Sequence, residues 1–217
     1  MIKAVIFDMD GLMVDTEPIQ SKSFENVIRS YGVEPVFGSS GLVHQVGVRG
    51  DKNFRAMKKR YNIADEVEVL RKKRRVEYEK LLEDGIEPMP GLMSLLELLQ
   101  QKRIHIALAS GSPLKHIKFI LDSIGATKYF EVIISGEDVR HGKPNPECFI
   151  KTSQLLKIPA EKCLVIEDAE SGVNAACKIG MKVIAVPSRH TDKHTMVNAD
   201  KVLSSLAKIT WKIIEAI

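Results

Sequence analysis

The sequence predicts an α/β protein in which helices cover both faces of a parallel β-sheet and a small helical domain is inserted after the first strand. Short apolar runs recur along the chain, and helix-length amphipathic stretches separate them. Strands that alternate with helices form parallel sheets that are buried on both faces. Residues 16–89 break this rhythm, because their pattern is helical and highly charged throughout.

The expected strands are short apolar runs bounded by loop-forming residues. The first covers residues 3–7 and opens into a loop that contains Asp8 and a glycine. The later runs are residues 104–109, 132–134, 164–166 and 183–186. A chain of 217 residues with this pattern can bury a sizeable core without disulfides or an obligatory partner.

Residues that start and stop helices lie between these runs. Ser112 can cap a helix that has Pro113 at its first position, and Gly125 lies where that helix would stop. Residues 145–146, Asn-Pro, form a similar start signal, and Gly180 ends the stretch that precedes the last run. Helices are therefore expected between successive strands of the sequence.

The inserted segment is predicted to be a separate helical domain. Its helical stretches are residues 18–31, 52–61 and 65–82. The segment ends at residues 87–91, Glu-Pro-Met-Pro-Gly, a stiff proline-containing joint. We expect an α/β core made of residues 1–15 and 90–217, and a helical unit made of residues 16–89.

The composition excludes several classes of protein. Apolar residues make up 44% of the chain and charged residues 28%, which is the balance of a globular protein. No apolar run approaches the ~20 residues of a membrane-spanning helix, and the apolar stretch at residues 4–7 is too short for a signal peptide. Cys148, Cys163 and Cys177 form no CxxC pair, which argues against a disulfide framework and suits a reducing cytoplasm.

The charge balance bears on partners. A net charge of +4 permits anionic ligands but does not demand nucleic acid. We expect a cytoplasmic monomer that binds a small molecule and has no nucleic-acid or membrane partner.

Polar residues follow the expected strands at the edge where open parallel sheets bind ligands. In chain order these are Asp8 and Asp10, then Ser110, Gly111 and Ser112, then Lys143, then Glu167 and Asp168. Each pattern alone is common in turns and helix starts. Together they bring several acids, small hydroxyl residues and one lysine to the same edge, which predicts a functional site there.

This set suits phosphoryl transfer assisted by Mg²⁺. Neighbouring carboxylates repel one another unless a cation lies among them, and oxygen ligands suit Mg²⁺. Backbone N–H groups of the 110–112 loop and the ammonium of Lys143 can hold phosphate oxygens. Asp10 lies two residues beyond Asp8 and can donate a proton to a leaving oxygen. Gly11 lets the chain turn so that both carboxylates face inward.

Four motifs span nearly the whole chain: Val-Ile-Phe-Asp-Met-Asp-Gly-Leu-Met-Val-Asp-Thr (5–16), Ala-Ser-Gly-Ser (109–112), Gly-Lys-Pro-Asn-Pro (142–146) and Val-Ile-Glu-Asp-Ala-Glu-Ser-Gly-Val (165–173). Their order and spacing resemble the haloacid dehalogenase superfamily, in the branch with an α-helical cap after the first strand. This branch includes β-phosphoglucomutase-like proteins and sugar-phosphate phosphatases. The resemblance implies a Rossmann-like core and makes residues 16–89 the cap.

The resemblance also implies a two-step phosphoryl transfer. Asp8 would be the nucleophile that forms an aspartyl-phosphate, and Asp10 would protonate the leaving alcohol and then activate water. Mg²⁺ would be held by Asp8, the backbone carbonyl of Asp10 and Asp168, with Glu167 helping directly or through water. The phosphate-binding residues would be Ser110, Gly111, Ser112 and Lys143. An acid at position 10 favours phosphate esters over carbon–halogen bonds.

Two enzyme functions stay open at this point. Attack on the aspartyl-phosphate by water makes a phosphatase of a small phosphorylated metabolite such as a sugar phosphate. Attack by a sugar hydroxyl makes a β-phosphoglucomutase-type phosphotransferase that interconverts sugar 1- and 6-phosphates. Gln20 and Gly50 stand where the mutase branch often has a histidine and an acid, which weakens the mutase assignment without excluding it. We favour the phosphatase, because hydrolases are the commoner outcome for sequences that resemble this family. A protein that only binds its ligand is the non-enzymatic alternative.

The inserted segment holds two further candidates. Arg49 either grips a second phosphate of the substrate, caps a helix-starting loop or lies in solvent. Residues 71–75 are five successive basic residues, which we interpret as a solvated helix face. The alternatives are phosphate capture by Arg74 or Arg75 and a nucleic-acid patch.

Overall fold

The computed structural model describes residues 1–38, 43 and 51–217. The chain divides into two compact units, Met1–Asp15 with Ile86–Ile217 and Thr16–Gly85. The smaller unit ends at Gly85, a few residues before the boundary expected after residue 89. Met89 donates its N–H to the carbonyl of Met13 at 2.8 Å, and Pro88 forms a bridge with Val14. The proline joint therefore packs with the larger unit.

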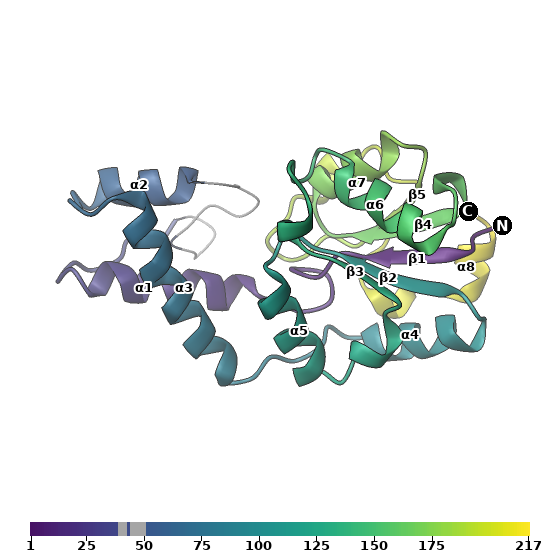
Figure 1. The fold of residues 1–217 in the computed structure, drawn as a ribbon, viewed down its shortest axis with the longest axis horizontal. Coiled ribbons are helices and arrows are strands. Elements are labelled where there is room, and N and C mark those ends of the chain that lie inside the picture. Colours follow the sequence, from purple (N-terminus) through teal and green to yellow (C-terminus); the bar gives the residue numbers. More distant parts are fainter. Residues whose placement is uncertain (39–42, 44–50) are drawn as a thin grey trace. The chain divides into compact units, whose positions relative to one another are not determined.

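The larger unit is built on a six-stranded parallel sheet with the order β3-β2-β1-β4-β5-β6 (Figure 1). The strands are β1 (Ala4–Phe7), β2 (His105–Ala109), β3 (Val132–Ile134), β4 (Cys163–Glu167), β5 (Lys182–Ala185) and β6 (Lys201–Val202). The predicted parallel α/β core is confirmed. Among the strands of the described residues, only β6 was not predicted, because it is two residues long, exposed and without an apolar run.

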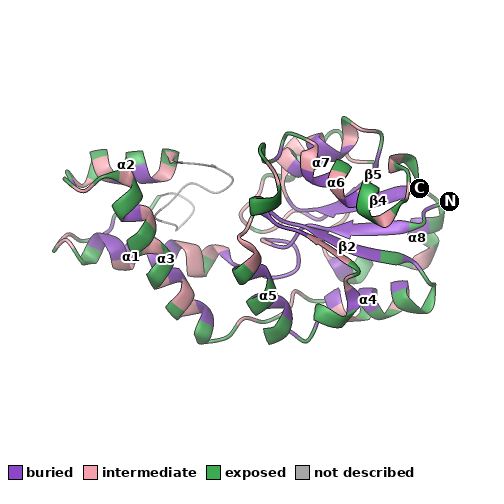
Figure 2. Ribbon diagram, viewed as in Figure 1, coloured by how far each residue is buried: buried purple, intermediate pink, exposed green. Residues whose placement is uncertain are grey.

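Helices cover both faces of this sheet, with α6 and α7 on one face and α4, α5 and α8 on the other (Figure 1). Their bounds are α4 (Leu92–Gln101), α5 (Leu114–Ser123), α6 (Glu147–Leu156), α7 (Glu170–Cys177) and α8 (Trp211–Glu215). Short 3₁₀ helices are η1 (Thr127–Tyr129), η2 (Gly136–Asp138), η3 (Ala160–Lys162), η4 (Lys193–Thr195) and η5 (Leu206–Lys208). β1 and β4 are buried along their whole length, so the sheet forms the centre of the core (Figure 2).

The start of α5 differs from the prediction. Ser112 was expected to cap this helix, but the helix begins at Leu114 after Pro113, and no side chain caps it at the N-cap position. The hydroxyl of Ser112 instead donates to a carboxylate oxygen of Asp10 at 2.8 Å. Gly125 follows the helix with φ +67°, in the left-handed region expected after a helix end.

The smaller unit consists of α1 (Glu17–Arg29), α2 (Lys52–Arg60) and α3 (Val67–Glu83). Its helices share a hydrophobic core of its own, formed by Phe24, Val27, Ile28, Phe54, Met57, Ile63 and Leu70. Within the described part of the chain, no helix is long and apolar enough to cross a membrane.

In the basic run at residues 71–75, Lys72, Lys73 and Arg75 are exposed, and Arg71, Lys73 and Arg74 contact other residues of the smaller unit. Arg71 pairs with Asp51 and Glu68, and Lys73 pairs with Asp65 at 3.0 Å. Arg74 points inward and lies over the rings of Phe24 and Tyr78, at 5.3 and 4.6 Å from their centroids. Its guanidinium also donates to Ser23 at 2.9 Å and Gln20 at 3.2 Å. These contacts give Arg74 a packing role within the helical unit.

Arg74→Ala is therefore expected to lower the free energy of unfolding by about 1–3 kcal/mol, since it removes stacked packing and hydrogen bonds together. Arg75→Ala is the matched control. Arg75 is exposed, and its loss should change stability by no more than ~0.5 kcal/mol. Urea denaturation of both variants tests this, and equal midpoints for the two would contradict the packing role.

Candidate active site

The loop after β1 brings Asp8 and Asp10 to the carboxyl edge of the sheet. It turns at Gly11, which has φ +85° and donates its backbone N–H to the carbonyl oxygen of Val14 at 2.8 Å. A Cβ atom at this glycine would lie 2.3 Å from Oδ2 of Asp168. Glycine is thus required here twice, by the backbone conformation and by the close approach of Asp168.

Lys143 reaches the same edge from the loop before α6. Its Nζ lies 2.5 Å from Oδ1 of Asp8, 2.5 Å from Oε1 of Glu167 and 3.0 Å from the carbonyl oxygen of Ala109 at the end of β2. Burial lowers the pKa of Lys143, but the charges of Asp8 and Glu167 outweigh burial and raise that pKa above its ordinary value. The lysine is therefore a charged group that joins three strand ends.

Asp8, Glu167 and Asp168 form a buried acidic cluster. One carboxylate oxygen of each lies within 4.8 Å of the others. Burial raises the pKa of both Glu167 and Asp168, and the neighbouring carboxylates add to this effect. Three carboxylates and the ammonium of Lys143 leave two negative charges, which is the charge that a divalent cation neutralises. The oxygen-only donor set also suits Mg²⁺.

Glu167 is held firmly in this cluster. Its Oε1 pairs with Lys143, and its Oε2 accepts the backbone N–H of Ala169 at 3.0 Å. Gly172 on α7 packs directly against it, since a Cβ atom there would lie 1.7 Å from Oε1. The glycine of the fourth motif thus makes room for the carboxylate.

The 110–112 loop lies against Asp10. Ser110 donates its hydroxyl to Oδ2 of Asp10 at 3.2 Å, and Ser112 donates to the same oxygen at 2.8 Å. Gly111 packs against Gly136, where a Cβ atom would lie 2.2 Å from the carbonyl oxygen of Gly111. The structure therefore places both predicted serines beside the second acid of the β1 loop.

All predicted site residues of the larger unit lie at this one sheet edge, whereas Arg49 lies outside the described residues. Two contacts were not predicted. Ser188, shortly after β5, acts to lower the pKa of Asp168 against the effect of burial, and the ring of Phe149 lies 4.9 Å from Nζ of Lys143. The strand-end rule applied to β5 could have found Ser188. No pattern in the sequence marks Phe149, which reads as an ordinary core residue of α6.

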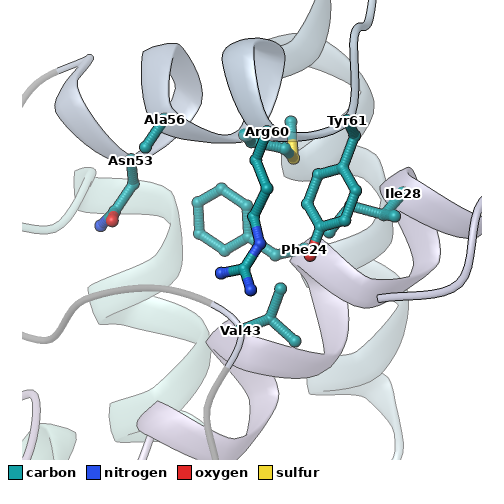
Figure 3. A pocket seen from close by; sticks show the side chains of 8 residues that line it. Phe24, Ile28, Val43, Asn53, Ala56, Arg60 and Tyr61 are labelled. Carbon is teal, nitrogen blue, oxygen red and sulfur yellow. The ribbon is translucent and has the colours of Figure 1, made fainter. Parts of the chain in front are cut away.

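The smaller unit contains a cavity of about 110 Å³. Figure 3 shows the guanidinium of Arg60 between Phe24 and Tyr61, above Val43. The remaining lining residues are Ile28, Asn53, Ala56 and Met57. None of the predicted site residues that the structure describes lines this cavity.

A buried carboxylate, a second acid beside it and a charged lysine suit an enzyme that transfers or hydrolyses an anionic group. Residues 5–186 match the haloacid dehalogenase-like hydrolase family, and the chain belongs to that family.

Similar proteins with known names indicate which class of hydrolase the chain belongs to. The chain is 33% identical over 184 residues to a phosphorylated carbohydrates phosphatase of Thermotoga maritima, covering 84% of each chain. It is 31% identical to hexitol phosphatase A of Escherichia coli, covering 96% of this chain and 93% of the relative. A solved Thermotoga maritima structure provisionally named a beta-phosphoglucomutase superposes with a TM-score of 0.82 and 28% identity, over 100% of both chains. The chain is thus a phosphoric monoester hydrolase of the haloacid dehalogenase-like family.

Proposed function

We propose that this chain is a Mg²⁺-dependent phosphatase of small phosphorylated metabolites, with sugar phosphates as the first candidates, and that Asp8 carries the phosphoryl group between two steps. One observation carries the proposal. The carboxylate of Asp8 is buried within 4.8 Å of two further acids and is paired with a charged lysine at 2.5 Å. The lysine, together with a divalent cation held by the acids, would neutralise an anionic nucleophile so that it can approach an anionic phosphate.

The metal would be held by Asp8, the backbone carbonyl of Asp10 and Asp168, with Glu167 in direct contact or acting through water. Bound Mg²⁺ would neutralise the two residual negative charges of the cluster and polarise the phosphoryl oxygens. The loop geometry at Gly11 supports this assignment, because it brings Asp168 against the β1 loop.

In the first step, the carboxylate of Asp8 attacks phosphorus and the bond from phosphorus to the ester oxygen breaks. Asp10 gives its proton to that leaving oxygen. In the second step, water attacks phosphorus, Asp10 takes a proton from the water, and the bond between phosphorus and the Asp8 oxygen breaks to release phosphate. Ser110, Gly111 and Lys143 would hold the phosphoryl oxygens throughout.

The two units take different roles in this proposal. The larger unit would be the catalytic core and the smaller unit a cap that selects the substrate and excludes water. Arg49 belongs to the cap as a candidate for a second substrate phosphate. The named substrates of the relatives are phosphorylated carbohydrates and hexitol phosphates, which supports sugar phosphates here. A cytoplasmic monomer completes the proposal, and the three free cysteines agree with a reducing compartment.

A β-phosphoglucomutase-type phosphotransferase is the second candidate, favoured by the likeness to the Thermotoga maritima structure. The site chemistry is the same up to the aspartyl-phosphate. The difference is whether water or a sugar hydroxyl attacks next.

A panel of phosphorylated metabolites separates these functions. With Mg²⁺ present, we expect phosphate release from one or more sugar or polyol phosphates, and we expect EDTA to abolish it because the residual negative charge of the cluster then repels the substrate. Adding Mg²⁺ back should restore the rate. Silence across the panel, together with turnover of β-glucose 1-phosphate primed by a bisphosphate, would replace the phosphatase with the mutase.

A further inference from the structure

We propose that Ser112 is a positioning residue that holds the carboxylate of Asp10, rather than a ligand of the transferred phosphate. The proposal rests on the proposed role of Asp10 as proton donor and acceptor. It revises the expectation that Ser112 binds phosphate.

The hydrogen bonds around Asp10 carry the inference. Ser112 donates its hydroxyl to Oδ2 of Asp10 at 2.8 Å, which is the shorter of the two serine contacts to that oxygen. Ser112 also donates its backbone N–H to the hydroxyl oxygen of Ser110 at 3.0 Å. The hydroxyl of Ser110 in turn donates to Asp10. Ser112 therefore acts on Asp10 both directly and through Ser110.

The helix that follows does not need the hydroxyl of Ser112. The backbone N–H of Leu114, the first residue of α5, donates instead to Oε2 of Glu137 at 3.0 Å. The carbonyl of Ser112 accepts the N–H of Gly136 at 3.0 Å. These contacts tie the 110–112 loop to η2, so the direction of the Ser112 side chain is set from outside the site.

Two donors on one oxygen restrict the rotation of a carboxylate. A general acid is effective only when its proton lies within hydrogen-bond reach of the leaving oxygen. Without Ser112, Asp10 would keep its proton chemistry but spend less time in the productive orientation. The loss should therefore depend on how much the leaving group needs a proton.

Leaving-group dependence gives the first test. The parent enzyme and Ser112→Ala are compared by kcat/KM on an alkyl phosphate from the active panel and on 4-nitrophenyl phosphate, whose leaving group needs little protonation. We expect a loss of about tenfold on the alkyl ester, which is part of the roughly 10²–10⁴-fold that a general acid contributes, and of less than about twofold on the aryl ester. Equal losses on both esters would show contact with the phosphate, and no loss on either would also overturn the proposal.

A double-mutant cycle gives the second test. If Ser112 acts through Asp10, Ser112→Ala should cause no further loss in the Asp10→Asn background, whereas a phosphate ligand would cost the same in both backgrounds. Ser112→Thr keeps a hydroxyl and should restore most of the rate. Ser123→Ala is the matched control, because this exposed serine on α5 donates its hydroxyl to the carbonyl of Phe119 at 2.8 Å.

The two proposals fail separately. Retention of activity by Asp8→Asn would overturn the covalent phosphatase mechanism. The double-mutant cycle between Asp10 and Ser112 compares ratios of rates. It therefore tests the role of Ser112 with any phosphate ester that the parent enzyme hydrolyses.

Discussion

Asp8→Asn is expected to lower kcat for phosphate release by on the order of 10⁴-fold or more, as loss of a covalent nucleophile does in other enzymes. An amide keeps the shape of the carboxylate but is a poor nucleophile. The variant should stay folded, because it removes one charge from a crowded cluster in which two other acids are buried. A phosphate-release assay with a thermal unfolding midpoint measured on the same sample separates lost chemistry from lost structure.

Asp84→Asn is the matched control for this variant. Asp84 is exposed at the end of α3, so the same change of charge there should leave kcat within about twofold, as for surface substitutions of small energetic effect. The covalent step has its own readout. Substrate labelled with ³²P should leave hydroxylamine-sensitive label on the parent protein and none on Asp8→Asn. Label on both proteins would place the nucleophile elsewhere.

Lys143→Met is expected to lower the free energy of unfolding by about 3–5 kcal/mol at neutral pH, since it leaves buried carboxylates without their counter-charge. Lys143 pairs with Asp8 and Glu167 at 2.5 Å each, and its ammonium is buried. Activity should also fall below detection, because the nucleophile loses the cation beside it. Urea denaturation measures the free energy of unfolding. Lys118→Met, which replaces an exposed lysine on α5, is the control.

The pH dependence of this loss of stability follows from the pKa values of the buried acids. Burial raises the pKa of Glu167 and Asp168 in the folded protein, so the folded state binds more protons than the unfolded state above pH ~4. Stability therefore falls as the pH rises through the folded pKa values. Removing Lys143 raises those values further, and the deficit of the variant should shrink between pH 8 and pH 5. A deficit that is constant over this range, or larger at pH 5, would contradict the charge argument.

Much of the fold followed from local patterns. The runs at residues 3–7, 104–109, 132–134, 164–166 and 183–186 each correspond to a strand of the sheet. Alternation of strands and helices implies a parallel sheet, and the strand-end rule then predicts where ligands bind. β6 escaped prediction because its two exposed residues have no apolar run. It depends on pairing with β5 rather than on its own composition.

The candidate site was predictable as a set of residues but not as a set of contacts. The strand ends point to Asp8, Asp10, Lys143 and Asp168, since each follows an apolar run. Phe149 was missed because nothing in its neighbourhood separates it from ordinary core residues, whereas Ser188 follows β5 and was missed because the strand-end rule was not applied there. Arg74 shows the same limit, since helical spacing alone does not say which of five successive basic residues points inward.

The sequence by itself determined the α/β class, the inserted helical unit, the family and the edge of the sheet where the candidate site lies, because these depend on local periodicity and on motif order. Only the tertiary structure decided which groups touch. Lys143 pairs with Asp8, which lies 135 positions away in the sequence. The hydroxyl of Ser112 donates to Asp10 and does not cap α5. Such partners are set by packing and by the need to satisfy buried charges, which act between segments that lie far apart in the sequence.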